Sequence, residues 1–192
     1  MCKLPTKRTA RPPPASRYAL GPDMLLSLLG ATAAIALIGL ASWSDESGRA
    51  LVLYAVLAFG ALAAAIAAGL RRNREGIVVA GSFGSAALGL ILLQGALSLP
   101  FATVAAAFIG VGLGGPLAAL LAWRRRSARG SPAAFAVAAL FVGQAGGALT
   151  WTGLAASPLP PGSALILLAT LLGLAAVASP GLVESSKSAP EA

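Results

Sequence analysis

The chain has 192 residues, of which 57% are hydrophobic and 10% charged, and its mean hydropathy is +0.84. These values lie outside the range of soluble globular proteins and exclude a soluble single domain. The formal net charge is +8, but the basic residues fall in a tail and short loops, which offer no folded face for nucleic acid. Cys2 is the only cysteine, so the sequence contains no disulfide framework and no thiolate metal site.

Residues 1–23 form a basic, proline-rich tail that is predicted to be disordered, because it cannot bury enough apolar surface to order itself. Six apolar stretches follow, each close to the roughly 20 residues that a helix needs to cross a bilayer. They lack the alternation of barrel strands, so the sequence predicts an all-α, polytopic fold of six transmembrane helices. The predicted helices cover residues 24–42, 50–70, 77–99, 101–123, 132–151 and 163–179, and residues 180–192 form a second short tail.

Two local features refine this prediction. Residues 98–101 read as a very tight hairpin, which would make the third and fourth helices antiparallel neighbours. Gly39-Leu40-Ala41 has the small-x-small spacing of a signal-peptidase site after a basic start. Cleavage there would leave five helices and an external N-terminus, and this alternative stays open.

The basic residues predict the orientation. All but one of the 14 fall on alternate connections and on the two tails, and Arg49 is the exception. The positive-inside rule therefore places both termini in the cytoplasm, with the arginine loops beside anionic lipid headgroups. The abundance of Ala and the excess of Arg over Lys resemble high-GC bacterial coding, so the expected location is the bacterial cytoplasmic (inner) membrane.

The predicted spans contain no Asp, Glu, Lys, Arg or His. Proton relays, ion sites and haem ligation need such groups within the membrane, and a serine without a base in reach is not activated as a nucleophile. We therefore expect no enzyme, no catalytic residue, no cofactor and no metal site. Among the few polar residues, Gln94 and Gln144 are the most costly to expose to lipid. Each is expected to face another helix or, in the sharper hypothesis, to line a polar path for a solute.

Small residues recur at helical spacing in the fourth and fifth helices and would let these helices approach closely. Mid-helix Pro116, which follows a glycine-rich run, predicts a kink that either gates a pathway or is ordinary bending. The two small-residue stripes are Thr103, Ala107, Gly110 and Gly114 in the fourth helix, and Ala139, Gly143, Gly146 and Thr150 in the fifth.

The connection between the second and third helices resembles the loop motif of the major facilitator superfamily, Gly-x-Leu-x-Asp-Arg-x-Gly-Arg-Arg. Gly69, Arg74 and Gly76 fall in register, and Asn73 replaces the Asp. The basic pair after the last Gly is absent here, as is the Arg often found in that family's fourth helix. The resemblance covers residues 51–153 and implies a six-helix half-repeat, in which these four loop residues would control conformational change.

Members of that superfamily join two six-helix halves, so a lone half lacks a complete central path. The first hypothesis is a half-size, transporter-like protein that moves a small neutral or apolar solute as a homodimer, with Gln94 and Gln144 touching the cargo. The second is a non-transporting accessory or scaffold subunit that packs against a partner complex in the membrane.

Overall fold

The computed structural model describes residues 22–41, 47–70, 75–96, 98–127, 132–158 and 162–187. Within these ranges the chain forms six helices and no strand, and every helix is long and apolar enough to cross a membrane. The predicted fold class is thus confirmed, while most of the predicted N-terminal tail lies outside the described residues. The helices are α1 (Pro22–Ala41), α2 (Ser47–Leu70), α3 (Glu75–Gln94), α4 (Leu99–Ser127), α5 (Pro132–Ala155) and α6 (Ser163–Lys187).

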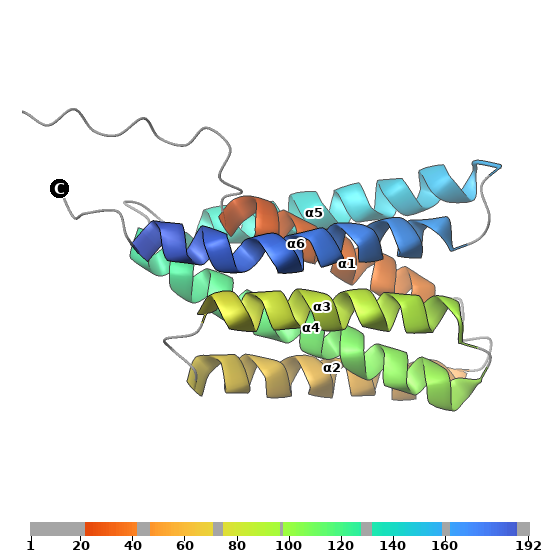
Figure 1. Ribbon diagram of the computed structural model, residues 1–192. Coiled ribbons are helices and arrows are strands. Elements are labelled where there is room, and N and C mark those ends of the chain that lie inside the picture. Colours follow the sequence, from red (N-terminus) through yellow and green to blue (C-terminus); the bar gives the residue numbers. More distant parts are fainter. Residues whose placement is uncertain are drawn as a thin grey trace, which may run out of the picture.

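The helices form a two-layered bundle (Figure 1). Helices α3 and α6 make one layer, α1 and α4 lie behind them, and α5 and α2 flank the bundle on opposite sides. The most extensive contacts join α4 to α2 and to α3, α1 to α5, and α3 to α6. In α4, 56% of the most apolar window is buried, against 11% in α5 and 6% in α2. Helices α2 and α5 are therefore peripheral.

The contact pattern relates the first three helices to the last three. When α1, α2 and α3 are exchanged for α4, α5 and α6, the α1–α5 contact becomes the α4–α2 contact, and the α3–α6 and α1–α4 contacts map onto themselves. The close α3–α4 contact has no equally extensive counterpart between α6 and α1. Two helices, α2 and α3, lie between α1 and α4, and each helix reverses the direction of the one before it, so α1 and α4 run in opposite directions. These contacts resemble those of an inverted repeat, and the extensive α3–α4 contact departs from that pattern.

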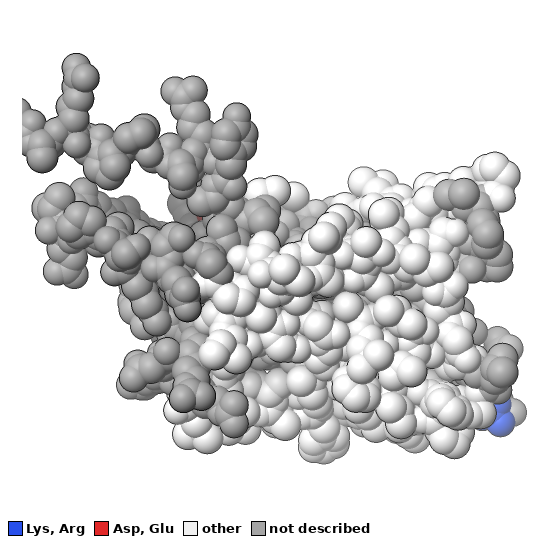
Figure 2. Space-filling model, viewed as in Figure 1, with Lys and Arg blue, Asp and Glu red and all other residues white. Residues whose placement is uncertain are grey.

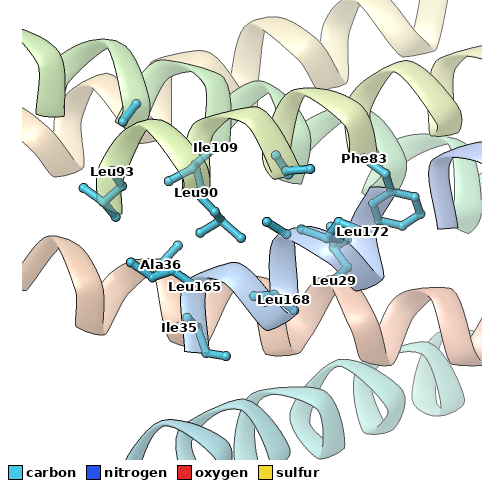
Figure 3. Close-up of a cluster of buried hydrophobic side chains, with 14 of the residues drawn as sticks. Leu29, Ile35, Ala36, Phe83, Leu90, Leu93, Ile109, Leu165, Leu168 and Leu172 are labelled. Atoms are coloured by element: carbon cyan, nitrogen blue, oxygen red, sulfur yellow. The ribbon is translucent and has the colours of Figure 1, made fainter. Parts of the chain in front are cut away.

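The interior is apolar and built from α1, α3, α4 and α6 (Figure 3). Large side chains such as Phe83, Leu90, Ile109 and Leu172 are fully buried there. Leu29 of α1 points into the same cluster. Because lipid tails are as apolar as leucine, close packing rather than escape from water holds this cluster together.

The predicted connection between α3 and α4 was misplaced. Helix α3 ends at Gln94, and α4 already begins at Leu99, so Leu99 and Pro100 belong to the first turn of α4. Proline is tolerated there because its missing N–H would have no helical partner. The Ala102 N–H donates to the Ser98 carbonyl over 3.1 Å and closes this turn. The prediction that α3 and α4 are neighbours is confirmed.

The predicted last span, residues 163–179, agrees with the apolar span Ser163–Pro180, but the helix itself is longer. Helix α6 does not stop before Pro180 but continues through it to Lys187. Pro180 leaves the carbonyl of Ala176 without its usual N–H donor. The buried hydroxyl of Ser179 donates to that carbonyl over 3.1 Å and replaces the lost bond. Helices α4 and α5 likewise extend about one turn beyond their predicted ends.

Candidate functional site

Three glycines bring α1 and α5 into backbone contact. A Cβ on Gly147 would lie 2.7 Å from the Ala31 carbonyl oxygen, well inside van der Waals contact. A Cβ on Gly143 would overlap the carbonyl oxygen of Ser27, and one on Gly30 would overlap that of Leu140. Only a residue without a side chain permits this approach.

An equivalent contact joins α2 and α4. A Cβ on Gly110 would overlap the carbonyl oxygen of Leu57, and one on Gly114 would overlap that of Ala61. From the other side, a Cβ on Gly60 would lie 3.0 Å from the Ala107 carbonyl oxygen. Both Gly-x-x-x-Gly pairs of the sequence are thus used inside the molecule. The two small-residue stripes approach α2 and α1 and do not meet each other, because α4 and α5 make little contact.

The glycine-rich run of α4 also packs closely against a second helix, α3. A Cβ on Gly112 would lie 2.6 Å from the Ala86 nitrogen of α3, and one on Gly115 would overlap the hydroxyl of Ser82. Helix α4 is therefore approached closely from two sides. Pro116 is fully buried next to this contact, and the helix continues through it. Its role as a kink stays a prediction.

Most polar side chains within the spans bond to their own helix. The hydroxyls of Thr32, Thr103 and Thr170 donate to carbonyls four residues earlier, over 2.7, 2.8 and 2.9 Å. Two side chains reach another helix instead: Ser85 donates to the Phe108 carbonyl over 2.9 Å, and Tyr54 to the Leu37 carbonyl over 3.4 Å. Polar groups in the described spans thus serve helix packing.

The Ser85 bond gives a measurable contribution. In Ser85→Ala the Phe108 carbonyl loses its donor on α3, and we expect the free energy of unfolding to fall by about 0.6 kcal/mol, the average for such bonds in membranes. Thr170→Val is the matched control, because that hydroxyl bonds only within α6. Reversible unfolding in mixed micelles measures both variants, and an equal loss in the two would contradict the assignment.

The two glutamines occupy different positions along their helices. Gln94 is the last residue of α3, and a Cβ on Gly162, before α6, would lie 3.2 Å from its Cγ. Gln144 is exposed on α5. Gln94 is exposed as well, so what each glutamine faces in the membrane stays a prediction. The structure brings the two glutamines into no common site.

The structure describes two of the four residues of the loop motif. Gly69 is exposed in the last turn of α2, and Gly76 is half-buried in the first turn of α3. Asn73 and Arg74 lie outside the described residues. Among side chains that the structure describes, Asp23 and Arg49 are the charged ones, and both lie near helix ends. The face drawn in Figure 2 is accordingly almost uncharged where it is described.

Comparison with known proteins finds no matching family model, no matching curated protein and no matching solved structure. Sequence reasoning missed the single glycines Gly30, Gly60 and Gly89, which oppose carbonyl groups of a neighbouring helix. No local signal marks them, since a lone glycine in an apolar helix has no distinguishing spacing. Ser179 was also missed, although its position directly before Pro180 was a usable signal.

Proposed function

We propose that this multi-pass membrane protein is a half-size, transporter-like protein that moves a small neutral or apolar solute and acts as a dimer. The observation that carries the proposal is the exchange of the α1–α5 and α4–α2 contacts between the two halves of the chain. Inverted repeats of three helices are typical of secondary transporters, in which rocking of packed helices alternates access to a central site.

The glycine contacts supply a means of movement. Helices that touch through glycines carry no interlocking side chains at the crossing, so they can tilt without repacking a core. In Figure 1, α1 and α5 lie close near the start of α1 and diverge toward its end. Leu37, near that end, is 42% exposed, while Ile35, Ala36 and Leu40 around it are buried. The exposed side of α1 at Leu37 is our candidate for the mouth of a solute path.

The resemblance to the major facilitator superfamily gives roles to the other residues. Gly69, Asn73, Arg74 and Gly76 would control the conformational change. A path without ionisable side chains favours a neutral or apolar solute over an ion. A six-helix unit needs a second copy to enclose such a path.

A second candidate function is a membrane accessory or scaffold subunit. It is favoured by the outward position of Gln144 and by polar side chains that bond mainly within their own helices. A protein of this kind needs a lateral binding face and no water-filled path.

Thiol accessibility distinguishes the two functions without knowledge of the solute. In a Cys2→Ser background, Leu37→Cys places a thiol at the candidate mouth on α1, and Val52→Cys places one at a similar distance from the helix end on α2, where the native side chain is 47% exposed. Transport predicts that a membrane-impermeant maleimide labels Leu37→Cys readily and Val52→Cys hardly at all. If neither thiol reacts, both positions face lipid and the scaffold function is favoured.

A further inference from the structure

We propose that two copies of this chain associate through the outward face of α5, with the Gln144 side chains of the two copies hydrogen-bonded to each other. The inference rests on the dimer of the proposed function and names its contact surface. It starts from a polar side chain that a single copy leaves exposed in the middle of the membrane.

Gln144 lies close to the middle of the 20-residue span Ala136–Ala155. Its side chain is exposed, and no hydrogen bond within the described part of the chain involves its amide. Hydrocarbon offers no partner to an amide, so its exposure to lipid is unfavourable. Gln94, by contrast, ends its helix and can reach the polar headgroup region.

The two peripheral helices differ in what they expose. Helix α2 presents large apolar side chains, as expected for contact with lipid: Leu51, Phe59, Leu62, Ile66 and Leu70. Helix α5 also exposes Gln144, Thr150 and Thr152, and its mean hydropathy is the lowest of the six spans. Amide and hydroxyl side chains are typical of helix–helix contacts in membranes. The composition of α5 therefore favours contact with a helix of another protein molecule.

The chemistry of glutamine favours a second copy as that neighbour. All copies of a membrane protein share one orientation, so a two-fold axis along the membrane normal brings each residue opposite its own counterpart at the same depth. An amide is both donor and acceptor, so two facing Gln144 side chains can satisfy each other. Two lysines or two glutamates would repel in the same place.

The spacing along α5 fits such a pairing. One stripe of α5 follows the alternating spacing of four and three residues that lines the seam of two helices crossing at a small angle: Val137, Phe141, Gln144 and Ala148. The next position in this series, Trp151, is half-buried against the core of its own chain and ends the stripe. Val137 and Phe141 are 50% and 65% exposed, so one side of this seam is free in the single copy. Gln144 lies in the middle of the seam.

Cysteine crosslinking in native membranes tests the contact. In the Cys2→Ser background, Val137→Cys lies on the seam, and Val142→Cys lies on the opposite side of the same helix with 69% exposure of the native side chain. With a short bis-maleimide we expect a product of twice the chain mass from Val137→Cys and none from Val142→Cys. A crosslink from Val142→Cys alone, a product of another mass, or no product would overturn the α5 interface.

Energy transfer between labelled copies in lipid vesicles tests Gln144 itself. Gln144→Leu should raise the dissociation constant about three- to tenfold, and Gln94→Leu should leave it unchanged. An equal effect of the two variants, or none, would overturn the role of Gln144. Maleimide labelling of Leu37→Cys tests the solute path independently of the dimer contact. If Leu37→Cys is labelled but the α5 contact is not found, this interface is refuted and the transport proposal stands.

Discussion

Gly143→Leu is expected to destabilise the folded protein by about 3 kcal/mol or more, as overpacking of a tight contact does. Any side chain at this position would overlap the carbonyl oxygen of Ser27, and that oxygen belongs to the backbone of α1, which cannot rotate away. The helices would have to separate along the whole α1–α5 contact. The loss is measured as the change in free energy of reversible unfolding in micelles or bicelles.

Gly146→Leu is the matched control on the same helix. Nothing lies within 4 Å of a Cβ built at Gly146, which is exposed. Leucine has a higher helix propensity than glycine by roughly 0.5–1 kcal/mol, so this variant should be unchanged or slightly more stable. If both variants lost stability equally, the effect would come from the glycine-to-leucine change itself and not from the contact with α1.

The contrast between these two positions explains what stabilises the bundle. In water a leucine added to a surface is mildly unfavourable and a buried one is favourable, but in a bilayer both surroundings are apolar. Steric fit between backbones is then the main source of specificity. This is why glycines recur at the α1–α5, α2–α4 and α3–α4 contacts.

The helices were predictable from the sequence because hydrocarbon imposes a simple requirement. A chain that crosses it must satisfy its backbone hydrogen bonds within each segment, and a minimum length follows from the thickness of the bilayer. Length and apolarity alone therefore gave the number and type of elements. The helix ends were less predictable, and two of the differences fall at Pro100 and Pro180. Position in the first turn and a replacement donor, Ser179, make each proline compatible with a helix.

The contacts were less predictable than the helices. Helical spacing correctly indicated that Gly110 and Gly114 share one face, and that Gly143 lies on such a face as well, but it does not say which helix that face meets. Gly146 was grouped with Gly143 by spacing, yet the structure leaves it open. The neighbour of each face depends on the packing of all six helices together, which no local pattern specifies.

We expect both ends of the chain to lie in the cytoplasm. A fluorescent protein fused after Ala192 should fold and fluoresce in the cytoplasm, and alkaline phosphatase inserted between α1 and α2, or between α5 and α6, should be active outside. The reason is the asymmetry of Lys and Arg, each of which favours the anionic cytoplasmic surface by about 1 kcal/mol. Alkaline phosphatase that is active after Ala192 would contradict this orientation.

An N-terminal epitope tag decides between six helices and five. If the chain keeps all its helices, the tag remains on the full-length product and is protected from protease in intact cells. Cleavage after Ala41 would remove the tag together with α1. That loss would have a structural consequence, because Leu25, Leu26, Leu29 and Leu40 are buried in the bundle and Gly143 and Gly147 would lose the backbone that they oppose. A cleaved product should therefore show no loss of stability on Gly143→Leu. The stability measurement and the epitope tag are thus two independent tests of the α1–α5 contact.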